Sequence, residues 1–185
     1  MRRKQTFQRR QHLDVATMEE LVKRFEGLGP AERINAFLAV QEKTDDRFTQ
    51  PFVKKEVKLK KLQVHGPTSA TGTFTFKVAG FYCNGSGNLH GGAQSMMYDI
   101  CSSLVLQSIG KPGGWMNAGV SRTLTVNYLR PAPEGTELEI ECEVIAAGKT
   151  LSMLRGVLRR ADNGAPISTC EHNKVAVASK PNWKL

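Results

Sequence analysis

The strongest constraint on the fold is one long apolar segment that carries a single charge. Residues 93–109 contain no Gly, Pro, Lys or Arg, and their apolar side chains lie on every side of a helical wheel. A helix that is apolar all round is expected to be buried. The sequence therefore predicts a buried helix at the centre of the domain, entered through the glycine-rich residues 84–92.

Asp99 is the one charged residue of this helix. An ionised carboxylate removed from water is costly unless another group pairs with it or a reaction uses it. One interpretation is an Asp that binds backbone donors or an Arg from a neighbouring strand. The other is a general base or nucleophile held in a largely apolar pocket, and the sequence favours this functional interpretation.

The rest of the chain predicts a curved antiparallel sheet around this helix, an α+β architecture. Period-two alternation and β-rich composition predict strands over residues 52–64, 70–79, 121–129, 137–144, 151–160 and 167–178. Two further helices are expected near the N-terminus, one opening with the capping box at Thr17 and one running from Pro30 to about Lys43. Residues 44–51 are polar and are expected to be a linker, which gives two parts: an N-terminal extension with a basic tail (1–50) and the main domain (51–180).

Charge and cysteine content exclude several classes of protein. The net charge of +9 is concentrated in an Arg-rich tail over residues 2–10 and a lysine cluster over residues 54–61, without a nucleic-acid motif or interleaved aromatic residues. We expect no nucleic-acid partner. The four cysteines are far apart and no histidines cluster with them, so we expect reduced thiols and no metal site.

The sequence also leads to an expectation of location. No apolar run approaches the roughly 20 residues that span a bilayer, and the N-terminus has no secretory signal. We expect a soluble, intracellular, cytoplasmic protein; the Arg-rich start would also fit a mitochondrial targeting segment, although Asp14, Glu19 and Glu20 follow soon after.

Residues 52–178 resemble the hotdog-fold acyl-CoA thioesterases, in particular the branch with the phenylacetate-pathway and small human-type enzymes. The resemblance is carried by a spaced pattern rather than by one motif. Its parts are Asn84-x-x-Gly87-x-x-His90-Gly91-Gly92, then Asp99, Gly119-Val120-Ser121, the segment Asn127 to Ala132, and Gly148 to Leu151.

The resemblance implies a hydrolase of acyl-CoA thioesters with four catalytic residues. The N–H of Gly91 would polarise the thioester carbonyl, which is physically reasonable at a helix N-terminus. Asn84 would orient the substrate, although a loop Asn can also bind its own turn. Asp99 would activate water or attack the carbonyl, and Ser121 would help to place the water. His90 is more consistent with shaping the turn into the helix than with a role as base.

By resemblance, several further residues bind the substrate, and no cofactor is implied beyond coenzyme A as part of that substrate. Arg130 and Lys149 are the candidates for holding its phosphates through charge-assisted bonds; ordinary surface charge is the alternative. The complete set of predicted substrate-binding residues is His90, Gly92, Tyr128, Arg130, Pro131, Gly148, Lys149 and Thr150.

Helix geometry predicts an oligomer. Gly91 and Asp99 are eight residues apart, which is about 12 Å along a helix axis. One carbonyl carbon cannot be reached from both, so the two groups of one site should come from different chains. We therefore expect a homodimer or a dimer of dimers, as the resemblance also implies.

Two other functions remain open from the sequence. A hotdog hydratase or dehydratase would act on enoyl or hydroxyacyl thioesters, but such enzymes place their His and Asp or Glu pair differently. A non-catalytic acyl-CoA-binding or scaffold protein would keep the fold without needing Asp99. The joint presence of Asn84, Gly91, Asp99 and Ser121 favours the thioesterase.

Overall fold

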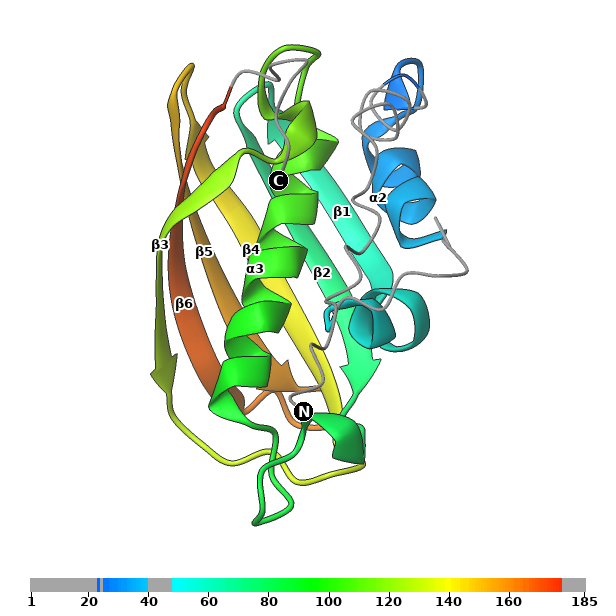
Figure 1. The fold of residues 1–185 in the computed structure, drawn as a ribbon, viewed down its shortest axis with the longest axis vertical. Helices are drawn as coiled ribbons and strands as arrows, with labels where there is room; N and C mark the ends of the chain where they lie inside the picture. Colours follow the sequence, from blue (N-terminus) through cyan, green and yellow to red (C-terminus); the bar gives the residue numbers. More distant parts are fainter. Residues whose placement is uncertain (1–22, 24, 40–47, 178–185) are drawn as a thin grey trace, which may run out of the picture.

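The computed structural model describes residues 23, 25–39 and 48–177, and within them six strands form one antiparallel sheet (Figure 1). The strand order is β1-β2-β4-β5-β6-β3, so β1 and β3 are the edges. The strands are β1 (Lys58–Gly66), β2 (Ser69–Lys77), β3 (Val120–Tyr128), β4 (Glu137–Ala147), β5 (Leu151–Arg160) and β6 (Pro166–Val175).

The long helix α3 (Gly91–Ser108) lies across one face of this curved sheet (Figure 1). Eleven of its eighteen residues are buried. In β4, Ile140, Cys142 and Val144 are buried, whereas the glutamates between them line the other face of the strand. The predicted hotdog fold, a curved antiparallel sheet around a buried helix, is confirmed.

Tyr98 fixes the position of α3 against the sheet. Its hydroxyl donates to the carbonyl of Ser168 (2.7 Å) and accepts from the amide of Leu158 (2.8 Å), which ties the helix to β5 and β6. A Cβ at Gly156 would lie 2.9 Å from the Tyr98 ring, so glycine is required for this close approach. Tyr98 immediately precedes Asp99, and its anchoring therefore determines where Asp99 lies.

The N-terminal extension docks on the C-terminal end of α3 through α2 (Pro30–Ala39). Arg33 donates from Nη1 to the carbonyl of Gly110 (2.7 Å), where a positive charge stabilises a helix C-terminus. Ile34 is fully buried in the common core. Most of the predicted first helix lies outside the described residues, although Lys23 and Phe25 near its end are helical and Phe25 is buried. The basic tail, residues 40–47 and the end of the chain after residue 177 also lie outside the described residues.

The strand predicted for residues 52–64 is wrong in its first part. Residues Phe52–Glu56 form the short π-helical segment η1, and β1 begins only at Lys58. Phe52 and Val53 are both buried, which a strand with one wet face does not allow. The Phe52 ring instead packs edge-on against Phe76, with centroids 5.2 Å apart. Short 3-10 turns, η2 (Gly80–Tyr82) and η3 (Trp115–Asn117), complete the described elements.

Candidate active site

Asp99 lies on the side of α3 that faces the edge strand β3. The hydroxyl of Ser121, at the start of β3, donates to Oδ1 of Asp99 at 2.6 Å. The Asp99 side chain is 47% exposed, so the predicted burial of this carboxylate is wrong for a single chain. The reason is that β3 is an edge strand with no neighbour on its outer side, and nothing within residues 25–39 and 48–177 covers this side of the helix.

Two buried residues of β6, His172 and Lys174, approach both Asp99 and Ser121. Nε2 of His172 lies 2.9 Å from Oγ of Ser121 and 3.4 Å from Oδ1 of Asp99. Nζ of Lys174 donates to Oγ of Ser121 (3.2 Å) and of Ser103 (2.8 Å), and lies 3.9 Å from Oδ1 of Asp99. All of these contacts reach Oδ1, which leaves Oδ2 without a partner among the described residues.

Burial changes the charge states of these two side chains. Burial, and next the charge of Lys174, lower the pKa of His172 to about 4, against the opposing effect of Asp99. His172 is therefore neutral at pH 7, and its approach to Asp99 is not an ion pair. Burial also lowers the pKa of Lys174, while the nearby Asp99 acts in the opposite direction.

The hydroxyl of Ser121 is held from three directions. Its proton goes to Asp99, one lone pair accepts from Lys174, and the other can accept from N–H at Nε2 of His172. In that tautomer Nδ1 of His172 accepts from Ser102, 2.7 Å away, although the Ser102 proton also has the Tyr98 carbonyl at 2.7 Å. This network fixes Ser121, and through it one oxygen of Asp99.

The other end of α3 presents free main-chain donors. His90 is the N-cap, and its Nδ1 accepts from the amide of Gly92 at 2.9 Å. The amide of Gly91 has no acceptor among the described residues. The Tyr128 hydroxyl donates to the Gly91 carbonyl (3.0 Å), and a Cβ at Gly91 would lie 3.1 Å from the Tyr128 ring. Tyr128 therefore covers the start of the helix beside the free amide.

Asn84 lies in the loop that leads to this helix and binds its own turn. Its Oδ1 accepts from the amides of Ser86 (3.0 Å) and Asn88 (3.1 Å). This is the alternative that the sequence left open for a loop Asn. These two hydrogen bonds use only the Oδ1 acceptor of Asn84. Its Nδ2 donors have no partner among the described residues, so Asn84 could still donate to a carbonyl.

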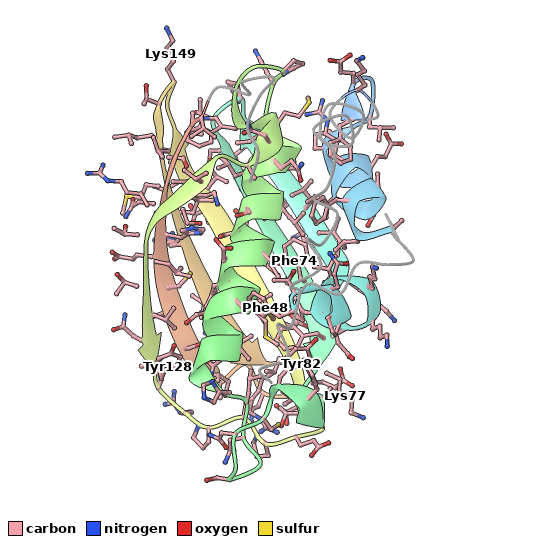
Figure 2. The ribbon with its side chains drawn as sticks, in the orientation of Figure 1. Phe48, Phe74, Lys77, Tyr82, Tyr128 and Lys149 are labelled. Atoms are coloured by element: carbon pink, nitrogen blue, oxygen red, sulfur yellow. The ribbon has the colours of Figure 1, made fainter. Side chains whose placement is uncertain are left out.

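The predicted coenzyme-binding residues fall into two groups at opposite ends of the molecule. Figure 2 shows Tyr128 near one end and Lys149 at the tip of the other. Arg130, followed by Pro131 in the loop after β3, donates to the carbonyl of Pro166 (2.9 Å). Gly148, Lys149 and Thr150 form the β4–β5 turn, where Trp115 donates to the Gly148 carbonyl (2.7 Å) and the Thr150 carbonyl accepts from Ala176 (2.8 Å). One chain does not bring the two groups together.

Sequence reasoning missed His172 and Lys174, to which it assigned no role. A signal existed in the spacing, because Cys170, His172 and Lys174 occupy alternate, buried positions of β6. A histidine and a lysine on the core-facing side of a strand need buried partners. Those partners could not be identified from sequence, because Ser121 faces Lys174 only through the pairing of β3 with β6.

Comparison with known proteins identifies the family. The sequence model described as the thioesterase superfamily matches residues 86–167. Acyl-coenzyme A thioesterase 13 of Mus musculus is 31% identical over 100 residues, which make up 53% of this chain and 67% of that protein. The chain belongs to the thioesterase superfamily. The predicted family and the prediction of a thioester hydrolase are confirmed.

Solved structures agree with this membership of the thioesterase superfamily at the level of the fold. Thioesterase superfamily member 2 from Mus musculus superposes with a TM-score of 0.62 at 24% identity, covering 80% of this chain and 98% of that one. A hypothetical thioesterase from Streptococcus pneumoniae, solved with coenzyme A, has a TM-score of 0.57 at 22% identity, with coverage of 66% and 86%. In the described residues, no helix is long and apolar enough to cross a membrane.

Proposed function

We propose that this chain is an acyl-CoA thioesterase that uses Asp99 as general base and the Gly91 amide as oxyanion donor, in sites shared between two chains. The observation that carries the proposal is the arrangement around Asp99. Ser121, His172 and Lys174 all approach Oδ1 and hold the carboxylate, while Oδ2 stays available to a water molecule.

The hydrolytic step follows from these groups. A water bound at Oδ2 of Asp99 attacks the thioester carbonyl carbon and gives one proton to the carboxylate. Negative charge develops on the carbonyl oxygen, which accepts from the Gly91 N–H at the positive end of α3. Collapse of the tetrahedral intermediate breaks the C–S bond, and Asp99 returns the proton to the leaving thiolate of coenzyme A.

Two chains are needed because the catalytic groups lie apart on one helix. Gly91 and Asp99 are separated by eight residues of regular α3, about 12 Å along the axis, whereas a base and its substrate must lie within about 3 Å. The exposed side of Asp99 lies beside the unpaired edge strand β3. A second copy that covers this edge would bring its own Gly91 to Asp99.

Coenzyme A is the proposed leaving group. Support comes from the similar Mus musculus protein, whose name states acyl-coenzyme A, and from the Streptococcus pneumoniae structure with coenzyme A. Arg130 and Lys149 are proposed to bind its phosphates, one from each chain, since the two lie at opposite ends of a single chain.

The test is release of coenzyme A, followed by chromatography because four protein thiols would react with a thiol dye. Acetyl-, octanoyl-, palmitoyl- and an aromatic acyl-CoA are offered to wild type and to Asp99→Asn. We expect kcat of Asp99→Asn to fall by about 10²–10⁴-fold. Asp162→Asn, an exposed aspartate paired with Arg160, is the matched control and should be unaffected. Full activity of folded Asp99→Asn would overturn the assignment of the base, and no release from any thioester by wild type would overturn the proposed function.

The shared site has its own test. Chains with Asp99→Asn are combined with chains in which Gly91→Pro removes the amide N–H. Each variant alone lacks one half of both sites, whereas a verified heterodimer has one intact site. We expect it to recover about half of the wild-type activity per dimer. No recovery would mean that each site is built from one chain.

A further inference from the structure

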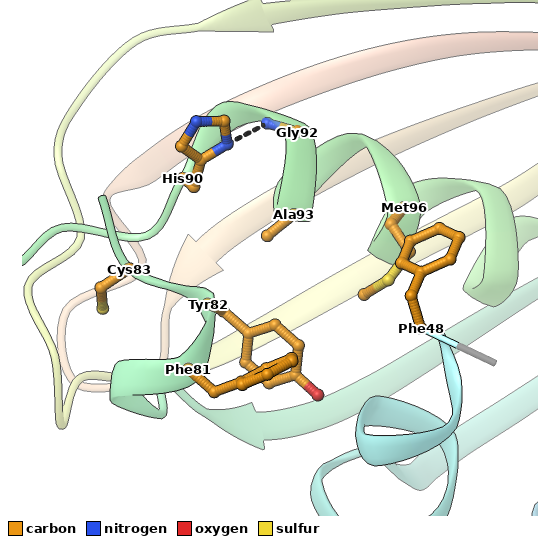
Figure 3. A pocket seen from close by; sticks show the side chains of 8 residues that line it. All are labelled: Phe48, Phe81, Tyr82, Cys83, His90, Gly92, Ala93 and Met96. Carbon is orange, nitrogen blue, oxygen red and sulfur yellow. Dashed lines mark hydrogen bonds between the residues drawn. The ribbon is translucent and has the colours of Figure 1, made fainter. Parts of the chain in front are cut away.

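An apolar pocket of about 430 Å³ opens beside the N-terminus of α3 (Figure 3). This volume is in the range of about 300–1,000 Å³ typical of small-molecule sites. The pocket is bordered by three aromatic rings, a thioether, a thiol and the first turn of the helix. Its lining residues are Phe48, Phe81, Tyr82, Cys83, His90, Gly92, Ala93 and Met96.

Two of the aromatic rings are unusually exposed. Phe81 is 74% exposed and Phe48 is 72% exposed, the highest values among the large apolar side chains of the described residues. Both lie in this one pocket. Large apolar side chains that are exposed together mark a place where an apolar partner binds. The two rings therefore indicate a ligand that covers them.

The inner wall of the pocket is anchored in the core. Tyr82 is 5% exposed and packs edge-on against Phe52 (6.2 Å between centroids) and Phe81 (5.1 Å). Met96, on α3, is also almost fully buried. The site thus has a fixed wall and two rings at its mouth, of which Phe48 comes from the segment that precedes η1.

The position of the pocket relates it to the reacting thioester. His90 and Gly92, which border it, flank the free amide of Gly91, and Cys83 precedes Asn84 in the chain. A thioester whose carbonyl accepts from Gly91 would have its acyl substituent beside the pocket. Among the described residues that line it, none is Asp, Glu, Lys or Arg, so an apolar substituent fits the chemistry of the pocket.

We propose that this pocket binds the hydrocarbon or aryl part of the acyl group and that Phe48 and Phe81 determine which acyl groups are preferred. The inference rests on the proposed function and deepens it. Half of the lining residues, Phe48, Phe81, Tyr82 and Cys83, lie outside the segment 86–167 that matches the family. The two residues proposed to set the preference, Phe48 and Phe81, are among those outside the matched segment.

The first experiment compares kcat/KM for acetyl-CoA and octanoyl-CoA. Burying one methylene group changes a binding or rate constant by about fourfold. We therefore expect Phe48→Ala and Phe81→Ala each to lower kcat/KM for octanoyl-CoA by about tenfold and to change kcat/KM for acetyl-CoA by less than about twofold. Because both rings are exposed, neither variant should unfold. Val64→Ala, which removes another exposed apolar side chain, is the matched control and should leave the ratio unchanged.

A pocket-filling variant should act in the same direction by a different cause. Ala93 lies on α3 and lines the pocket. Ala93→Leu keeps a strong helix former and places extra volume in the site. We expect it to lower kcat/KM for octanoyl-CoA more than for acetyl-CoA. A comparison of palmitoyl-CoA with an aromatic acyl-CoA then shows which shape of acyl group the pocket prefers. An unchanged ratio in all three variants would contradict the proposal.

The second experiment measures binding without turnover. Cys83 is half-buried in the pocket, whereas Cys101, Cys142 and Cys170 are buried in the core. In Asp99→Asn, octanoyl-CoA should slow alkylation of Cys83, followed by mass spectrometry, by severalfold, and coenzyme A or acetyl-CoA should not. Protection without hydrolysis by wild type would support the pocket while overturning the proposed function. No protection beyond that by coenzyme A would overturn the pocket as an acyl site and leave Phe48 and Phe81 as contacts for another protein.

Discussion

The two halves of the candidate active site use different kinds of chemical group. At the start of α3 the active group is the main-chain amide of Gly91, which needs only a helix N-terminus and space. Eight residues later the active group is the side chain of Asp99, which depends on Ser121 and on the buried His172 and Lys174. The amide half should therefore be sensitive to backbone changes, and the acid half to changes in the core.

Within the amide half, the largest effect is expected from removing the Gly91 donor. Gly91 is the first residue of the helix, where proline is tolerated, and His90 already has the extended backbone that precedes proline (φ −64°, ψ 139°). Gly91→Pro should therefore fold and lose about 10²–10³-fold in kcat. Gly91→Ala brings the same Cβ toward Tyr128 but keeps the N–H, and should lose much less. Equal losses would attribute the effect to crowding of Tyr128.

The acid half should make stability depend on pH. The pKa of His172 is about 4 in the folded protein and about 6.5 in the unfolded chain, so the unfolded chain binds more protons between these values. We expect the contribution of His172 to the free energy of unfolding to be complete above about pH 6.5 and to fall by roughly 3 kcal/mol as the pH drops to 4. Urea unfolding from pH 7 to pH 4 measures the slope. His172→Gln should remove this part of it, whereas His65→Gln, at an exposed histidine bonded to Thr71, should not.

The two halves of the candidate active site differ in how much of each the sequence predicts. The buried helix, most strand positions and the single charge of Asp99 follow from local patterns, since alternation and an all-apolar helix are visible in one segment. Gly91 and Ser121 came only from the family resemblance, and the order of the strands in the sheet was not predicted. The exposure of Asp99 and the identity of its buried partners depend on the long-range pairing of β3 with β6. The register of this pairing shifts between Ser121 and Thr123. The π-helical segment η1 was missed because Phe52 is fixed by Phe76 and Tyr82, which are distant in sequence.

Lys174→Met tests whether the acid half is organised for catalysis at a cost in stability. Methionine fills a similar volume without a buried charge, so thermal stability should stay equal or rise. Ser121 and Asp99 lose a fixed partner, and kcat should fall by about tenfold. Lys77→Met, at an exposed lysine, is the control; a loss of stability with kcat unchanged would make Lys174 a structural residue only.

The smallest effects are expected at the coenzyme phosphates, and they test how the two halves come together. Arg130→Ala and Lys149→Ala should each raise KM by about fivefold at low salt, less at high salt, with little change in kcat. Lys111→Ala, at another exposed lysine, should change neither. Tyr128, two residues before Arg130, and Lys149 lie toward opposite ends of one chain (Figure 2), so effects of both Arg130 and Lys149 on one KM would require residues from two chains. If only Arg130 contributes, the coenzyme lies along the amide half alone, and Lys149 is ordinary surface charge.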